Sequence, residues 1–247
     1  MRRRFICGNW KMNKTSTQAL EFLKKFTPLV KDVINSDIVL AAPFTLLSIL
    51  KEQLKNTNIK LAAQNLFYEK EGAYTGEVSP LMVLEFADYV IIGHSERRKH
   101  FLENNIIINR KIKAALATRL SVIFCLGETM EERKINMTKN VLERQLQDGL
   151  SAVKDIKRIV IAYEPVWAIG SGVNATPEQA ESAHFFLRGL LSGMYGKKIA
   201  EETRIIYGGS VSPENAPSIL RMPDVDGCLP GGASLDPVKF SKIIKAL

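Results

Sequence analysis

The stretch RIVIAYE at residues 158–164 decides the fold, because five consecutive apolar residues run straight into a carboxylate. A strand with one buried face alternates apolar and polar side chains, whereas a strand covered on both faces is apolar throughout. We therefore predict a buried strand of a parallel sheet here. Seven similar runs occupy residues 5–10, 38–43, 60–65, 89–94, 121–127, 204–209 and 226–231.

Helical patterns separate these runs. Residues 17–34 place Leu20, Leu23 and Phe26 at helical spacing, and 130–153, 177–194 and 237–246 follow the same pattern. Alternating strands and helices indicate an α/β fold, closed either as a doubly wound open sheet or as a (β/α)8 barrel. The count of eight strands and the length of 247 residues favour the barrel, as one domain over residues 1–247.

Composition narrows the class of protein. Hydrophobic residues make up 46% and charged residues 24%, which is ordinary globular usage. No apolar run is long enough for a membrane span, and the basic start MRRRF lacks the apolar core of a secretory signal. Three scattered cysteines without metal-ligand spacing predict reduced buried thiols, a cytoplasmic location and no metal site.

The net charge of +8 permits nucleic acid, a membrane surface or a small anion as partner. The two dense basic clusters, at residues 2–4 and 97–99, are short and carry no interleaved aromatic residues. We therefore expect no nucleic-acid or membrane partner, and a small anionic substrate becomes the more specific interpretation.

Polar residues gather where the predicted strands end. In a parallel barrel these ends share one rim, where function is concentrated. Glu164 follows an apolar strand, and the loss of hydration there makes a carboxylate a better base near neutral pH. His94 ends a strand at a helix start, which keeps its imidazole neutral and able to donate a hydrogen bond. Lys11 could anchor an anion, although a lone lysine is usually a solvated surface charge.

The loops supply three further candidates. The glycine pairs Gly208-Gly209 and Gly231-Gly232 follow the last two strands, where barrels bind phosphate through backbone N–H groups. A small-residue loop with an apolar tip after Glu164 resembles a closing lid. The long loop at residues 66–79 is rich in aromatic residues, which favours either a partner surface or packing against its own barrel.

Seven motifs in order resemble the triosephosphate isomerase family over essentially the whole chain. They are GNWKMN (8–13), AQN (63–65), GAYTGEVS (72–79), IIGHSERR (91–98), AYEPVWAIG (162–170), YGGSVSPEN (207–215) and GGASL (231–235). The resemblance implies a TIM barrel. It also implies interconversion of dihydroxyacetone phosphate and glyceraldehyde 3-phosphate through an enediol(ate), in glycolysis and gluconeogenesis, with no cofactor and no metal.

The resemblance also implies roles at matching positions. Glu164 matches the general base and His94 the neutral electrophile. Asn9 and Lys11 match the residues that hold the substrate, and Glu96 matches a supporting carboxylate. The phosphate cradle corresponds to Gly170, Ser171, Ser210, Gly231 and Gly232, and the lid to Pro165, Val166, Trp167, Ala168, Ile169, Gly170, Ser171 and Gly172. Loop 66–79 resembles the loop that joins two subunits of a homodimer or higher assembly, with Thr75 reaching the neighbouring site.

Four positions depart from the family pattern. Ser171 stands where Thr is usual, residues 173–175 lack a common Lys, Pro230 replaces Val, and Leu102 replaces Gly. Two other functions stay open on the residues alone. One is a different phosphosugar enzyme on the same barrel, which would need a Schiff-base lysine or another acid–base pair at a strand end. The other is a non-enzymatic binder that uses the +8 charge.

Overall fold

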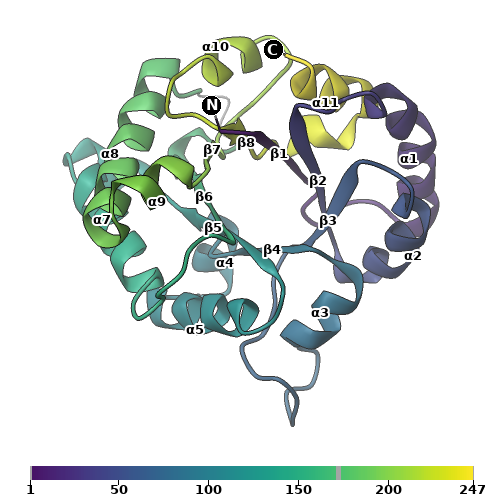
Figure 1. The fold of residues 1–247 in the computed structure, drawn as a ribbon, viewed down its shortest axis with the longest axis horizontal. Helices are drawn as coiled ribbons and strands as arrows, with labels where there is room; N and C mark the ends of the chain where they lie inside the picture. The colour runs from purple at the N-terminus through teal and green to yellow at the C-terminus, as the bar shows by residue number, and fades with distance from the viewer. Residues whose placement is uncertain (1, 171–173, 247) are drawn as a thin grey trace.

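The computed structural model describes residues 2–170 and 174–246, and it confirms the (β/α)8 barrel. Eight parallel strands pair in chain order, and β1 closes the ring against β8 (Figure 1). They are β1 Arg4–Asn9, β2 Ser36–Ala42, β3 Ile59–Ala63, β4 Tyr89–Ile92, β5 Ser121–Leu126, β6 Ile159–Tyr163, β7 Ile205–Tyr207 and β8 Gly227–Cys228.

The strands are apolar throughout because both of their faces are buried. Alternate residues such as Phe5, Val39, Ile123 and Val160 form one cluster inside the barrel. The residues between them pack outward against the helices in a second, larger cluster. Closure of the ring depends on Gly227, where a Cβ atom would lie only 1.9 Å from the backbone oxygen of Phe5.

Helices surround the barrel (Figure 1). They are α1 Ser16–Val30, α2 Phe44–Leu54, α3 Pro80–Phe86, α4 Ser95–His100, α5 Asn105–Leu116, α6 Met130–Lys134, α7 Thr138–Gly149, α8 Pro177–Tyr195, α9 Lys197–Glu202, α10 Ala216–Leu220 and α11 Pro237–Ile244, with 3-10 turns η1 Val166–Ala168 and η2 Gly232–Leu235. Thr15 and Thr176 begin α1 and α8 with capping boxes. No helix among these described residues is long and apolar enough to cross a membrane.

The prediction of a single helix over residues 130–153 is wrong. Asn136 adopts the left-handed conformation, with φ +57°, and ends α6. The Asn136 N–H donates to Arg133 O and the Met137 N–H to Glu132 O, which is the Schellman arrangement of a helix end. Asparagine tolerates this conformation better than most residues, so the helical spacing continues through a break in the backbone.

Several basic side chains on the surface stabilise the fold. Arg2 donates to Asp226 over 2.5 Å and Arg3 to Asp37 over 2.8 Å. Arg98 donates to the backbone oxygens of Gly93 and Cys125. The cluster at residues 2–4 therefore ties the start of β1 to its neighbours, and Arg98 ties α4 to β5.

Candidate active site

A cavity of about 260 Å³ opens at the carboxyl ends of the strands. The predicted residues Asn9, Lys11, His94, Gly170, Ser210, Gly231 and Gly232 all line it, together with Gly208 and Gly209. Positions more than 200 residues apart in the chain thus share one concave surface, because all eight strands end at the same rim.

Lys11 is fixed at the end of β1 by an unusual backbone. Its φ of +52° lies in the left-handed region, which costs a non-glycine residue about 1 kcal/mol. Its N–H donates to Asn9 Oδ1 over 3.0 Å, and its carbonyl accepts from Gln64 Nε2 over 3.0 Å. These bonds hold the strained turn and direct the ammonium group towards the cavity.

The ammonium group of Lys11 is paired with Glu96. Nζ lies 2.5 Å from Glu96 Oε1. Burial raises the pKa of the Glu96 carboxyl, but the hydrogen bond from Lys11 and the charge of Lys11 outweigh burial and hold this pKa below its usual range. Glu96 therefore stays ionised and keeps Lys11 in place as a cation.

His94 is the N-cap of α4, and its tautomer follows from its contacts. The Glu96 N–H donates to His94 Nδ1 over 3.2 Å. Because Nδ1 accepts, the proton of the neutral ring sits on Nε2. Nε2 lies 3.0 Å from Glu164 Oε1, and the ring is buried. The imidazole thus presents a donor beside the carboxylate.

Glu164 follows β6 and is 1% exposed. Its Oε2 accepts from the Ser95 N–H at the start of α4 over 3.0 Å. Its Oε1 has no hydrogen-bond partner among the described residues, although His94 Nε2 is at contact distance. One oxygen anchors the side chain, and the other is available to accept a proton from a ligand.

The glycines of the last two strand ends leave room around these side chains. A Cβ atom on Gly231 would lie 3.2 Å from Lys11 Cε. Gly232 begins η2, and Gly170 has a left-handed φ of +66°. Backbone N–H groups on such a surface suit an anion, and Lys11 supplies the opposite charge.

Glu128, to which the sequence analysis assigned no role, anchors the segment after Glu164. Glu128 follows β5 and is fully buried. Its Oε1 accepts from Trp167 Nε1 over 2.9 Å, and its backbone oxygen accepts from the Val166 N–H. The sequence held one signal for this contact: a carboxylate at the end of a predicted strand, and a single tryptophan in the lid motif. Ser171 and Gly172 lie outside the described residues.

Loop 66–79 begins at a buried polar cluster. Lys111 donates to Asn65 over 2.8 Å and to Glu103 over 2.6 Å. Phe67 stacks on Tyr68 at a ring distance of 4.3 Å and packs at a tilt against Tyr74 at 4.7 Å. The loop projects beyond the ring of helices between β3 and α3 (Figure 1), and Thr75 on it is exposed. Its aromatic residues therefore contact one another, and its tip is open to a partner.

The chain is similar to known proteins over its length. A family model described as triosephosphate isomerase matches residues 4–247. The triosephosphate isomerase of Thermodesulfovibrio yellowstonii is 52% identical over 246 residues, covering 99% of this chain and 100% of the relative. That of Geotalea uraniireducens is 49% identical over 248 residues, covering 99% of each. A crystal structure of triosephosphate isomerase from Bartonella henselae superposes with a TM-score of 0.91 at 38% identity, covering 99% of this chain and 98% of that one.

Proposed function

Because this chain belongs to the triosephosphate isomerase family, we propose that the cavity lined by His94 and Lys11, together with the buried Glu164 that contacts His94, is its active site. The protein is an isomerase that interconverts dihydroxyacetone phosphate and glyceraldehyde 3-phosphate in glycolysis. The observation that carries the assignment of the site is the 3.0 Å approach of His94 Nε2 to Oε1 of the buried Glu164 carboxylate.

Glu164 acts as the general base in this proposal. Its Oε1, which lies beside His94 Nε2, removes a proton from the carbon beside the substrate carbonyl and returns it to the neighbouring carbon. Burial deprives the carboxylate of water, and the Ser95 N–H fixes its direction. The base is thus oriented before the substrate arrives, which removes reorganisation from the chemical step.

His94 stabilises the charge that forms on the substrate oxygen. The proton on Nε2 is donated to the oxygen of the enediolate, as a preorganised hydrogen bond in a site shielded from water. Because His94 Nδ1 accepts from the Glu96 N–H, Nε2 is the nitrogen that carries the proton and acts as the donor.

Asn9, Lys11 and the glycine rim hold the substrate. The Lys11 ammonium attracts the phosphate dianion, and Ser210, Gly231 and Gly232 offer short groups and backbone N–H donors around it. Glu96 supports Lys11 through their ion pair. We assign residues 165–172 as the lid that keeps water from the intermediate, of which 165–170 are described.

The chain is proposed to work as one domain in a homodimer or higher assembly in the cytoplasm. Tyr74 is 45% exposed on loop 66–79, and Leu81 and Met82, which follow it on α3, are 55% and 53% exposed. Apolar side chains grouped in this way favour a protein partner. Three free, buried cysteines support a reducing compartment.

A coupled assay with glyceraldehyde 3-phosphate tests the assignment, with Glu164→Asp as the diagnostic variant. The shorter side chain pulls the carboxylate back by about 1 Å, and a misplacement of that size costs on the order of 10²-fold in kcat. Glu21→Asp on the exposed face of α1 is the matched control and should keep full activity. A Glu164→Asp enzyme with the kcat of the parent would remove Glu164 as the base.

A further inference from the structure

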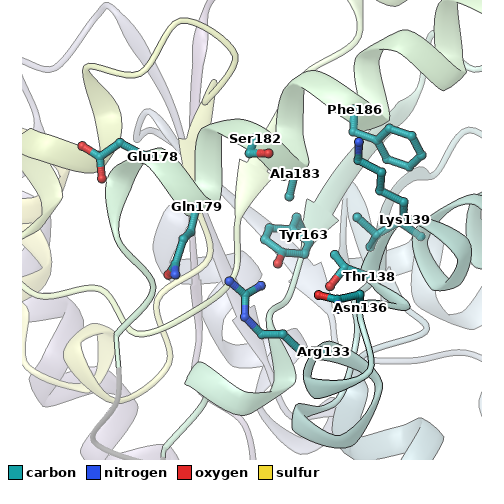
Figure 2. A pocket seen from close by; sticks show the side chains of 11 residues that line it. Arg133, Asn136, Thr138, Lys139, Tyr163, Glu178, Gln179, Ser182, Ala183 and Phe186 are labelled. Atoms are coloured by element: carbon teal, nitrogen blue, oxygen red, sulfur yellow. The ribbon is translucent and has the colours of Figure 1, made fainter.

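A second cavity, of about 430 Å³, lies outside the barrel wall between α8 and the break that separates α6 from α7. Figure 2 shows Arg133 and the Tyr163 hydroxyl facing each other at its centre, with Lys139 lying along Phe186. Its volume falls within the range of about 300–1,000 Å³ that small-molecule sites occupy. None of the proposed catalytic residues lines it.

The cavity is rich in hydrogen-bond donors. The side chains of Asn136, Thr138, Lys139 and Ser182 make no hydrogen bond or ion pair with any other described residue. Lys139 Nζ lies 5.5 Å from the centre of the Phe186 ring. Arg133 is already paired with Glu128, and the one carboxylate of the lining, Glu178, points away from the centre in Figure 2, so Lys139 is the cation that is available to a ligand. The site therefore favours an anion.

Apolar side chains also line the cavity. They are Leu142, Ala183 and Phe186, with the ring of Tyr163, and they lie among the polar residues (Figure 2). A ligand that suits both kinds of side chain carries a carboxylate head on an apolar, preferably aromatic, body. We propose that this cavity is a binding site for a small aromatic carboxylate, and that its occupation acts on the lid through Arg133.

Arg133 connects the cavity to the lid. Its Nη1 donates to Glu128 Oε1 over 3.1 Å, and its guanidinium carbon lies 4.4 Å from the centre of the Trp167 ring. The same Glu128 carboxylate accepts from Trp167 Nε1 and from the Tyr163 hydroxyl. Glu128 is fully buried, and Arg133 is its only cation among the described residues.

An anion in the cavity competes with Glu128 for Arg133. A buried carboxylate that loses its cation depends more strongly on its remaining donors, Trp167 and Tyr163. Trp167 then loses the guanidinium from its ring, but its hydrogen bond to the unpaired Glu128 carboxylate is the stronger of the two contacts and tightens. The lid therefore opens and closes more slowly, which lowers kcat when lid motion limits turnover. The proposed effect on the lid rests on the proposed role of residues 165–172 as a lid. The proposed binding of the carboxylate does not depend on catalysis.

Benzoate is the probe, and benzamide is its neutral control. Binding is measured by calorimetry and by the indole N–H signals in NMR, since the chain has only two tryptophans. We expect benzoate to bind at millimolar or lower concentration and to shift the Trp167 signal, assigned with a Trp10→Phe variant, while benzamide does neither. These readouts need no turnover, so they remain informative if the proposed catalytic roles fail.

Lys139→Gln should weaken benzoate binding about tenfold, the loss of about 1.4 kcal/mol, with activity in the absence of benzoate unchanged. Ser182→Met, which fills the cavity and keeps both cations, should weaken it similarly. Lys134→Gln is the matched control, because Lys134 is an exposed neighbouring cation outside the cavity. Equal affinity in all three variants, or no binding to the parent protein, overturns the site.

Kinetics test the connection to the lid. Saturating benzoate should lower kcat by about fivefold, at the low end of usual coupling between sites, with KM nearly unchanged. Inhibition that is competitive with substrate would place benzoate in the active-site cavity and overturn the proposal. Binding at the second cavity without a change in kcat would overturn the proposed effect on the lid.

Discussion

A Cβ atom on Gly208 would lie 2.7 Å from Cγ of Glu164. The two residues meet because β6 and β7 are neighbours in the barrel, and the Gly208 N–H donates to Tyr163 O over 2.7 Å. Glu164 is held at its far end by the Ser95 N–H, so a shift of its Cγ atom strains that hydrogen bond. The position of the Glu164 carboxylate therefore requires a glycine at residue 208, whether or not Gly208 also contacts an anion.

Gly208→Ala should lower kcat by on the order of 10²-fold with a small change in KM, because the methyl group displaces the carboxylate by about 1 Å. Steady-state kinetics and a crystal structure of the variant check both the rate and the displacement. Gly189→Ala is the control, since that exposed glycine of α8 has no atom near its Cβ position. Unimpaired kcat in Gly208→Ala would mean that Glu164 tolerates a shifted position.

Lys11→Met should abolish most activity and weaken the binding of glycerol 3-phosphate, a non-reacting substrate analogue, by more than about tenfold. The substitution removes the cation that lines the cavity and leaves Glu96 ionised beside it, which repels the phosphate dianion. Isothermal titration measures the affinity. Lys24→Met, on the exposed side of α1, should bind the analogue normally. Equal affinity in both variants would refute the anchoring role of Lys11.

Stability should fall in mild acid because of His184. Burial lowers the pKa of this fully buried ring from 6.5 to about 4. The folded state thus binds a proton less readily than the unfolded state. The resulting contribution, about 3 kcal/mol, is fully present above pH 6.5 and is lost as the pH falls from 6.5 towards 4.

Urea unfolding at fixed protein concentration, at pH 7.5 and at pH 5, measures this loss. His184→Asn keeps a donor near the Asp224 carbonyl, which lies 3.1 Å from His184 Nδ1, but it cannot gain a proton. Its free energy of unfolding should therefore depend less on pH over that interval. The same pH dependence in the variant would assign the acid sensitivity to other groups.

Deleting residues 68–75 and joining the ends with a short glycine turn should give a folded monomer of low activity. The base of the loop is closed by the Phe67 N–H, which donates to Val78 O over 2.8 Å, so the ends are already adjacent. Exposed Thr75 and Tyr74 are lost, and with them the contact proposed to complete a neighbouring site. Sedimentation and steady-state kinetics are measured on the same sample. A fully active monomer would limit the loop to a structural contact.

Sequence alone indicated the parallel α/β sheet and its rim, and it favoured a barrel over an open sheet. Eight short, continuously apolar runs are typical of strands covered on both faces, and parallel strands bring their carboxyl ends together. For that reason the positions of Asn9, Lys11, His94 and Ser210 at the ends of apolar runs were enough to assign them to one surface, and all four line one cavity. The hydrogen bonds that cap the starts of α1 and α8 are local as well, because each joins residues three positions apart.

Tertiary structure alone decided what these residues do to one another. Three contacts join separate segments at distances fixed by strand register. They are those of His94 with Glu164, of Glu128 with Trp167 and of Lys11 with Glu96. The break at Asn136 was also hidden, because helical spacing continues across one left-handed residue. Periodicity reports which face of an element is buried, whereas a contact between side chains depends on the packing of the whole barrel, which no local pattern encodes.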